Sequence, residues 1–429
     1  MHIYLVGIAG SMTAPLAIAL QKQGHKVTGS DQEKTFPPYR QQLKKANILI
    51  NQTPINSEID LAIIGSSYLF FKKTREDFEA VKAQKIPYIS ATEYLSKNLI
   101  KENSILVAGS YGKTTISAAL AHLLSQAKLN PSYMFGGQSL NRLDSLHFSD
   151  STWSVLEADE SINGLDTKAK FLYYPVKYLI LTSALWEHKE SYRSDAKNFA
   201  AFLELVKKIP SDGLLIYNQN DTSILPLLPH VKCQKIAYQK TSLSTSLIGK
   251  YNQENLGAVE TLAQNINISP QIIKKSLSSF KGVKRRLELC AQAGGIIFID
   301  DFAQSANRIK AALEVIKNTY PKSHLKVFYE AHASFMQYRS GVKQLCSVFN
   351  LADETVIFQL KFNSKISTKD RIVAKDFLEI IPQSLYLPLA SDVIKHYRKT
   401  LKKGDILIHF SSGGVEGQKT FRKIINLYK

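Results

Sequence analysis

The chain has little cysteine, and its cysteines are not arranged as a shared structural site. Cys233, Cys290 and Cys346 lie far apart among the 429 residues, and no two of them form a CxxC motif. A disulfide framework or a structural zinc site needs closely spaced or paired cysteines, so the sequence argues against both. We therefore expect a protein of a reducing compartment, the cytoplasm.

Long apolar runs and a basic leader are also missing. No apolar stretch approaches the roughly 20 residues that cross a membrane. The first residues, MHIYLVGIAGS, follow the pattern of a strand and a turn, so we expect no signal peptide and no membrane association. Hydrophobic residues make up 44% of the chain and charged residues 21%, which is typical of a globular protein. This length predicts roughly two to four domains.

Acidic side chains are in deficit, with 36 Asp and Glu against 55 Lys and Arg and a formal net charge of +19. Such a charge raises nucleic acid as a candidate partner. The lysines, however, come mostly as scattered pairs such as Lys44-Lys45 and Lys402-Lys403, with no long basic block. We interpret them as a solvated surface that attracts small polyanions, and we expect no nucleic-acid partner. For the oligomeric state we expect a monomer or a weak homo-oligomer.

The most informative segment present is LVAGSYGKTT at residues 106–115. An apolar run meets a glycine-rich turn, and the helix-like ISAALAHLLSQA follows. Glycines let backbone N–H groups approach phosphates, a helix N-terminus adds positive potential, and a lysine reaches the terminal phosphates. The full P-loop pattern has glycine where Val107 stands, and the alternative is an ordinary strand-to-helix turn. The residues expected to bind ATP or GTP here are Gly109, Ser110, Gly112, Lys113, Thr114 and Thr115.

Strand and helix patterns alternate along the whole chain, which predicts an α/β fold with parallel sheets. We expect three domains, at residues 1–102, 103–290 and 291–429. The first and third have Rossmann-like patterns, and the central one has the pattern of a P-loop ATPase. Examples of expected strands are DLAIIGSS in the first domain, YLILTSALWEH in the second and LKVFYEAH in the third.

Acidic residues end the segment WSVLEADE, which we take as the second strand of the central domain. Glu157, Asp159 and Glu160 would lie at the sheet edge that faces a ligand, where carboxylates can hold the Mg²⁺ that bridges ATP phosphates. Glu187 and His188 follow the next strand at the same edge. His188 is a candidate metal or phosphate ligand, although a lone histidine is more often structural.

Three further positions are candidates for nucleotide contacts. Asn252 and Asn255 share one face of an expected helix and either read a purine edge or cap the helix. Arg286 lies in a basic run between domains, where it either clamps phosphate or is a solvated hinge charge. Asp301 ends a strand and could meet ribose, a metal or an amine.

The first turn of the chain has the residues of a nucleotide site. Gly7, Gly10 and Ser11 follow the first strand, and Asp31 ends the second. A Rossmann dinucleotide site has a similar pattern, but its third glycine is missing, which weakens an NAD-linked oxidoreductase. Tight turns at the edge of the sheet explain the pattern equally well.

Together these motifs resemble the Mur ligases, the ATP-dependent amide-forming enzymes of peptidoglycan synthesis. The motifs GSYGKTT, EADE, KYNQENLGA, FKGVKRRLE and DDFA occur in the family's order over nearly the whole chain. The resemblance implies that ATP phosphorylates the carboxylate of UDP-N-acetylmuramate, after which an amine attacks the acyl phosphate. GIAGSMTAPLAIALQKQGHKVTGSD and EADESINGLDTKAKFLYY resemble family members that attach L-Ala-γ-D-Glu-meso-diaminopimelate more than those that attach L-alanine.

The resemblance also implies roles for individual residues. Lys113 would contact the β- and γ-phosphates, and Thr114 and Glu157 would hold Mg²⁺. His188 would serve a second metal or the acyl phosphate, while Asp301 would act from the C-terminal domain. The residues implied to contact the nucleotide are Asn252, Asn255 and Arg286, and those implied to bind the UDP-linked or amine substrates are Gly7, Gly10, Ser11, Asp31 and His332.

Several positions depart from the family pattern. Ser183 and Tyr251 stand where asparagine and histidine are usual. The residues that replace other usual motif residues are Glu187, Gln304, Ser305, Ala306, Ala331 and His332. Most of these changes fall in the C-terminal part, so the amine substrate is the least determined feature. A divergent Mur-like protein that binds nucleotide with altered or lost catalysis is the alternative.

Overall fold

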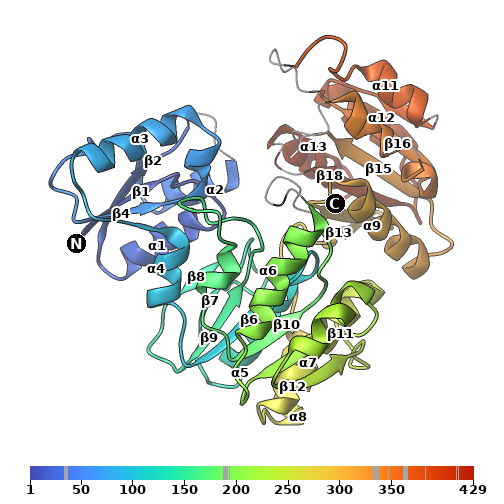
Figure 1. The fold of residues 1–429 in the computed structure, drawn as a ribbon. Coiled ribbons are helices and arrows are strands. Elements are labelled where there is room, and N and C mark those ends of the chain that lie inside the picture. The colour runs from blue at the N-terminus through green and yellow to red at the C-terminus, as the bar shows by residue number, and fades with distance from the viewer. Residues whose placement is uncertain are drawn as a thin grey trace. The chain divides into compact units, whose positions relative to one another are not determined.

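The computed structural model describes residues 1–32, 37–186, 192, 194–331, 338–345, 347–360, 366–381, 383–411, 413 and 415–429. It contains three sheets with packed helices (Figure 1), which confirms the expected α/β fold class. The chain divides into two compact units. The first comprises Met1–Leu247 and Tyr251–Val283, and the second comprises Ile248–Lys250 and Lys284–Lys429. Within the described ranges, no helix combines the length and apolarity that a membrane span needs.

The N-terminal sheet has five parallel strands in the order β3-β2-β1-β4-β5. Its central strand is buried along its whole length, because helices cover both faces of a parallel sheet. The strands are β1 (His2–Val6), β2 (Lys26–Ser30), β3 (Leu49–Ile50), β4 (Leu61–Ile64) and β5 (Tyr88–Ser90). The helices are α1 (Thr13–Lys22), α2 (Pro37–Lys45), η1 (Ser66–Leu69), α3 (Lys72–Ala83) and α4 (Ala91–Asn98).

The central sheet has seven strands in the order β12-β11-β10-β6-β9-β7-β8, and only the short edge strand β8 runs antiparallel to its neighbour. Its strands are β6 (Asn103–Ala108), β7 (Ser132–Met134), β8 (Leu146–His147), β9 (Trp153–Glu157), β10 (Tyr178–Leu181), β11 (Leu214–Asn218) and β12 (Gln234–Tyr238). Its helices are α5 (Lys113–Gln126), η2 (Lys170–Tyr173), α6 (Asp195–Lys207), η3 (Thr222–His230), α7 (Lys250–Asn265) and α8 (Pro270–Ser279).

The position of β9 corrects one expectation. WSVLEADE does not form the second strand of the central domain, because β7 and β8 come before it in the chain. These strands have three and two residues, too few to show the alternation by which a strand is recognised in a sequence. In space, however, β9 lies directly beside β6, so the acidic residues that follow it end near the glycine-rich turn.

Helix α5 is enclosed on all sides, and every residue from Thr114 to Leu124 is buried. It packs against β9, β6 and α8, which explains why ISAALAHLLSQA is apolar with only a weak amphipathic pattern. Packing on all sides fixes the position of the N-terminal end of the helix. The first turn of α5 is therefore held rigidly beside the end of β6.

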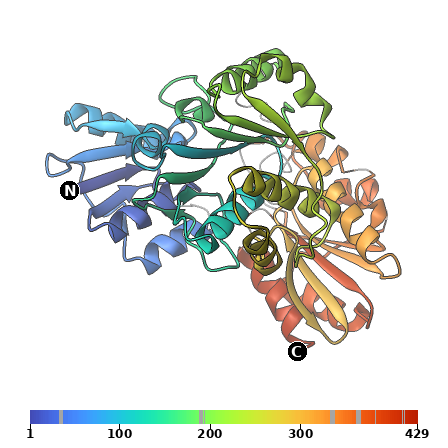
Figure 2. The same cartoon turned by 90° about the horizontal axis from the view of Figure 1, so that it is seen from below.

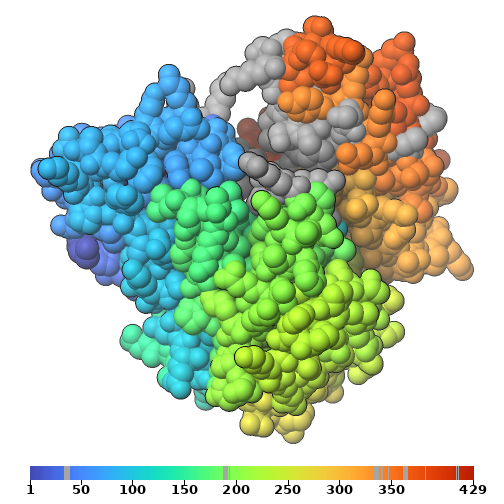
Figure 3. Space-filling view, in the orientation of Figure 1, coloured from blue at the N-terminus to red at the C-terminus, as the bar shows by residue number. Residues whose placement is uncertain are grey.

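The N-terminal and central sheets belong to the same compact unit. Helix α1 packs against β8, and α4 packs against η2. Lys22 and Asp144 form an exposed ion pair of 2.6 Å, and the Tyr68 hydroxyl donates a hydrogen bond to the carbonyl of Gly164. In the space-filling view the two parts form a continuous surface, coloured blue to green (Figure 3). The turn after β4 is thus joined to the segment after β9.

The second unit contains a six-stranded sheet in the order β13-β14-β18-β15-β16-β17, in which only β13 is antiparallel. Its ribbon is coloured mostly from orange to red in Figure 2. The main segment of this unit, Lys284–Lys429, starts ahead of residue 291, where the sequence suggested the domain boundary. Its strands are β13 (Glu288–Ala293), β14 (Ile296–Asp301), β15 (Leu325–Glu330), β16 (Glu354–Phe358), β17 (Ser384–Tyr386) and β18 (Ile406–Ser411). Its helices are α9 (Ala306–Thr319), α10 (Arg339–Lys343), η5 (Phe349–Leu351), α11 (Ala374–Ile380), α12 (Ala390–Thr400) and α13 (Val415–Asn426).

Candidate active site

The glycine-rich turn between β6 and α5 forms a backbone cradle that has no room for side chains at its glycines. Gly109 and Gly112 have φ angles of 120° and 76°, a region that favours glycine. A Cβ atom on Gly109 would lie 2.7 Å from the backbone nitrogen of Ser183, and one on Gly112 would lie 2.3 Å from Oδ1 of Asn255. Both glycines are therefore required by the fold of the turn, as expected for a phosphate cradle.

The end of β10 holds this turn in place. Ser110 donates its backbone N–H to Oγ of Ser183 at 2.8 Å, and its own hydroxyl donates to the carbonyl of Leu185 at 3.0 Å. Thr182 donates its hydroxyl to the carbonyl of Tyr111 at 2.6 Å. Ser183, where the family pattern has asparagine, thus supports the cradle in this chain. Thr182 was not recognised from the sequence, because nothing local marks a residue that supports a turn 71 positions away.

Lys113 begins α5 and reaches back over the cradle. Its ammonium donates hydrogen bonds to the carbonyl of Gly109 and to Oε2 of Glu160, each at 2.6 Å. Its side chain is only 12% exposed, so the charge lies inside the site rather than in solvent. This placement agrees with a lysine that meets terminal phosphates.

Thr114 and Glu157 form the part of the site that fits a metal ion. The hydroxyl of Thr114 donates to Oε1 of Glu157 at 2.9 Å, and Oε2 of Glu157 accepts the backbone N–H of Gly136 at 2.6 Å. A hydroxyl and a carboxylate beside a phosphate cradle are the hard oxygen ligands that Mg²⁺ uses. The two residues that the sequence assigned to Mg²⁺ are therefore brought together.

The other acidic residues after β9 have cationic partners. Asp159 accepts a hydrogen bond from Lys170 at 2.9 Å and another from Ser161 at 2.5 Å. Burial alone would raise the pKa of Asp159, but Lys170 and Lys113 outweigh it and hold this pKa far below its usual range. Asp159 is therefore ionised at neutral pH and keeps the segment after β9 in place.

Asn252 and Asn255 lie one turn apart within α7, and both are buried. Nδ2 of Asn255 lies 3.4 Å from Oδ1 of Asn252, and Oδ1 of Asn255 faces the Cα of Gly112. Tyr251, where the family has histidine, precedes them in the same helix. Asn255 thus packs directly against the cradle, which supports a place for it near a bound nucleotide.

The first turn of the N-terminal sheet is held by a buried carboxylate. Oδ2 of Asp31 accepts the backbone N–H of Ala9, and Oδ1 accepts that of Gln32, each at 2.8 Å. Burial raises the pKa of Asp31, and these two hydrogen bonds partly oppose the rise. Asp31 therefore anchors the turn between β1 and α1.

The glycines of this turn are also needed for close packing. Gly7 has φ of 75°, and a Cβ there would lie 1.9 Å from Oγ of Ser67, which follows β4. Gly10 donates its N–H to the Thr13 hydroxyl at 3.1 Å, whereas Ser11 is exposed. Ser67 and Thr13 were not singled out from the sequence, since serine and threonine are common at turns.

In the second unit, Asp301 has the same role as Asp31 in the first. Oδ2 of Asp301 accepts the N–H of Leu287, and Oδ1 accepts that of Ala303, each at 2.7 Å. Burial raises the pKa of Asp301, while the Arg286 charge lowers it. The guanidinium of Arg286 lies 5.7 Å from the ring centre of Phe302. The structure thus places Arg286 and Asp301 close together.

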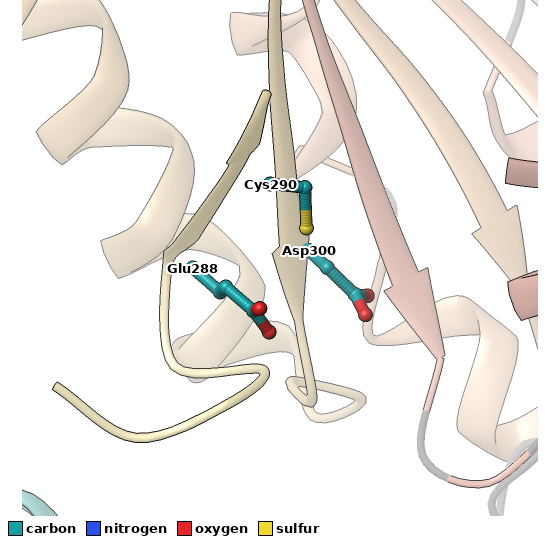
Figure 4. Close-up of side chains that lie close together, drawn as sticks. All are labelled: Glu288, Cys290 and Asp300. Atoms are coloured by element: carbon teal, nitrogen blue, oxygen red, sulfur yellow. The ribbon is translucent and has the colours of Figure 1, made fainter. Parts of the chain in front are cut away.

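A second group of possible metal ligands lies on β13 and β14. One ligand atom each from Glu288, Cys290 and Asp300 falls within 4.8 Å of the others (Figure 4). The guanidinium of Arg285 already supplies positive charge here, because its Nε lies 3.3 Å from Asp300. The backbone N–H of Arg285 also donates a hydrogen bond to Glu288 at 2.9 Å. His409 Nδ1 is a further partner of Asp300 at 2.9 Å. This group suits a cation less well than Thr114 and Glu157 do.

The remaining sequence candidates are only partly placed. Glu187, His188 and His332 lie outside the described residues. Gln304 is buried, and Ser305 and Ala306 stand at the start of α9.

Comparison with known proteins identifies the family. The sequence pattern of the "Mur ligase family, catalytic domain" matches residues 2–102, and that of the "Mur ligase middle domain" matches residues 107–246. The chain belongs to the Mur ligase family. The cradle, Lys113, Thr114 and Glu157 all lie within the middle domain of this Mur ligase, and the Asp31 turn lies within the first matched region.

Two named relatives are similar over almost the whole chain. The UDP-N-acetylmuramate--L-alanyl-gamma-D-glutamyl-meso-2,6-diaminoheptandioate ligase of Escherichia coli (strain K12) is 26% identical, covering 97% of this chain and 96% of its own. The UDP-N-acetylmuramate--L-alanine ligase of Clostridium kluyveri is also 26% identical, covering 96% of both chains. Both are named as ligases, in agreement with the enzyme class expected from the sequence.

Solved structures share the fold. UDP-N-acetylmuramate-alanine ligase from Thermotoga maritima superposes with a TM-score of 0.77 at 19% identity, covering 100% of this chain and 99% of its own. A murein peptide ligase from Psychrobacter arcticus gives a TM-score of 0.69 at 24% identity, covering 99% and 98%. These likenesses confirm the Mur ligase architecture expected from the motifs.

Proposed function

We propose that this chain joins the peptide L-Ala-γ-D-Glu-meso-diaminopimelate to UDP-N-acetylmuramate, with ATP and Mg²⁺, in the recycling of peptidoglycan. The observation that carries the proposal is the cradle of Gly109 and Gly112 with Lys113, Thr114 and Glu157 converging on it. The relative from Escherichia coli supports the choice of peptide. Since ATP and UDP-sugars are cytoplasmic metabolites, the proposal includes a cytoplasmic location.

Each domain has a part in the proposed reaction. Residues 1–102 bind the UDP-sugar through the turn that contains Gly7, Gly10 and Ser11. The carboxylate of Asp31 holds this turn in place by a hydrogen bond to its backbone. Residues 103–290 bind ATP in the cradle, beside Asn252 and Asn255. Residues 291–429 bind the amine substrate. Arg286 and Asp301 belong to the nucleotide side of the proposal, and His188 and His332 remain sequence-based candidates for metal and substrate contacts.

The first chemical step is transfer of a phosphoryl group. A carboxylate oxygen of the sugar acid attacks the γ-phosphorus of ATP, an O–P bond forms, and ADP leaves with the electron pair of the broken bond. Lys113 and the N–H groups at the start of α5 stabilise the negative charge on the phosphates. Thr114 and Glu157 would hold Mg²⁺, which supplies further positive charge when it is bound.

The second step forms the amide bond. The amine nitrogen of the peptide attacks the acyl carbon, a proton leaves the nitrogen, and inorganic phosphate departs from the tetrahedral intermediate. The protein needs no covalent intermediate of its own for this step. Its contribution is to align the two reactants and to exclude water, which would otherwise hydrolyse the acyl phosphate.

L-Alanine is the second candidate for the amine, because the relative from Clostridium kluyveri is equally similar to this chain. The two candidates differ in size and charge, so the same assay separates them. Phosphate release is measured with ATP, Mg²⁺ and UDP-N-acetylmuramate, and either the tripeptide or L-alanine is then added.

The proposal expects phosphate release that depends on the tripeptide and not on L-alanine. The reverse dependence would assign the chain to the alanine-adding reaction. If ATP binds but neither amine leads to phosphate release, both candidate reactions are contradicted. The chain would then be a protein that has kept nucleotide binding without ligation.

A further inference from the structure

Lys113 has an acidic partner that phosphate chemistry alone does not require. Its Nζ lies 2.6 Å from Oε2 of Glu160, and the two side chains are 12% and 2% exposed. Ion pairs this enclosed are weakly screened by salt and water. Glu160 is therefore a strong competitor for any other anion that approaches this ammonium.

The position of Glu160 is fixed through its backbone and its neighbours. Its carbonyl accepts a hydrogen bond from the hydroxyl of Tyr192. The residue before it, Asp159, is held by Lys170 at 2.9 Å, and the residue after it, Ser161, donates to Asp159. The carboxylate of Glu160 is thus presented from an anchored segment.

The Lys113–Glu160 ion pair affects how strongly the cradle attracts phosphate. The ammonium of Lys113 and the carboxylate of Glu160 cancel, so the cradle contains no net charge from the two. An incoming triphosphate brings several negative charges to the same ammonium. The β- and γ-phosphates must therefore displace the Glu160 carboxylate or share Lys113 with it, against the repulsion of that carboxylate.

We propose that Glu160 is a positioning residue that holds Lys113 inside the cradle before ATP arrives and then competes with the β- and γ-phosphates for its ammonium. The inference rests on the proposed ATP-dependent function. In this arrangement the side chain of Lys113 is already directed at the site when the nucleotide enters. The competition also weakens binding of ATP in the ground state, which leaves more of the binding energy for the transition state.

Calorimetric titrations of the intact chain with ATP and with AMP test the proposal. Glu160→Gln keeps the shape of the side chain and an oxygen acceptor but removes the charge. It should lower the Kd for ATP by about tenfold, the usual scale of a charge-assisted hydrogen bond. The Kd for AMP should not change, since AMP has no β- or γ-phosphate. Glu160→Asp, whose carboxylate is one methylene farther from Lys113, should give a smaller decrease.

A double-mutant cycle separates this role from a merely structural one. In a chain that already carries Lys113→Gln, the further change Glu160→Gln should no longer tighten ATP binding. Asp212→Asn is the matched control, because it removes the carboxylate from the surface ion pair with Lys177 and should leave the Kd for ATP unchanged.

An unchanged Kd for ATP in both Glu160 variants would overturn the inference while leaving the proposed function intact. A gain that persists without Lys113, or one that is equally large for AMP, would also overturn it. Failure of the wild-type chain to bind ATP would instead overturn the proposed function, and the inference with it.

Discussion

The hydroxyl of Thr114 donates a hydrogen bond of 2.9 Å to the carboxylate of Glu157, which joins the first turn of α5 to the end of β9. Glu157 also accepts the N–H of Gly136 at 2.6 Å, so its carboxylate is held from two sides. A metal ligand needs such support, because a fixed carboxylate loses little conformational freedom when it binds an ion. We therefore infer that Glu157 is the carboxylate that would bind Mg²⁺ in this Mur ligase.

Glu157→Ala should weaken Mg²⁺ binding and lower ligation activity at limiting Mg²⁺ by at least about tenfold. Excess Mg²⁺ should restore part of the activity, because Thr114 and the phosphates of ATP remain as ligands. The measurement is phosphate release over a series of MgCl₂ concentrations. Glu102→Ala, which changes an exposed residue of the same charge, should give the wild-type curve. Identical curves for Glu157→Ala and the wild type would remove Glu157 from the metal site.

Lys113→Ala should reduce ATP-dependent ligation by at least about a hundredfold, because it removes the cation that stabilises charge on the transferred phosphoryl group. The fold should persist, since α5 is held by the packing of its buried residues from Thr114 to Leu124. Circular dichroism and the phosphate-release assay together check both parts. Lys275→Ala on the exposed side of α8 is the control with the same loss of charge. Activity near the wild-type level in Lys113→Ala would refute the role of the lysine.

Gly112→Ala should abolish ATP binding, whereas Gly24→Ala should not affect it. The two glycines have similar φ angles of 76° and 88°, so both substitutions bring similar backbone strain, of about 1 kcal/mol. Only Gly112 is crowded, because its new Cβ would meet Asn255 at 2.3 Å, while nothing lies within 4 Å at Gly24. Thermal unfolding and ATP titration of both variants make the comparison. Equal effects would mean that the crowding at the cradle has no consequence.

Asp31 should make stability depend on pH in an unusual direction. Burial raises the pKa of Asp31 in the folded chain above the value of about 3.9 in an unfolded one. The folded state therefore binds this proton more tightly, and the stability that it contributes is complete below the unfolded pKa and declines as pH rises through the folded pKa.

The unfolding free energy of the wild type minus that of Asp31→Asn should accordingly decrease from about pH 4 upward and then become constant. Urea unfolding of both proteins at a series of pH values measures this difference. A difference that is flat, or that increases with pH, would show that the folded chain does not raise the pKa of Asp31.

The cradle could be predicted from the sequence because its signals are local. Two glycines, a lysine and two threonines stand between an apolar run and a helical pattern, and each has a specific conformational reason to be there. Glu157 could be predicted for a related reason: parallel strands end at one edge of a sheet, so an acid after a neighbouring strand arrives near the same ligand. The fold class followed from the regular alternation of strand and helix patterns.

What the sequence could not supply was the choice of partner for each charge. Glu160 stands beside Asp159 in the sequence, yet one pairs with Lys113 and the other with Lys170. The direction of each side chain depends on the path of the backbone after β9, which no local pattern encodes. For the same reason, sequence alone could not show that Asp31 accepts hydrogen bonds from the backbone of a neighbouring turn.

Formation of an acyl phosphate on the sugar acid can be followed through a carboxylate oxygen. UDP-N-acetylmuramate labelled with ¹⁸O in its lactyl carboxylate is incubated with the protein, ATP, Mg²⁺ and the tripeptide, and the released phosphate is analysed by mass spectrometry. If the acyl phosphate forms, one labelled oxygen should appear in the phosphate for each amide bond formed. Phosphate that contains no label, while the amide product accumulates, would contradict it.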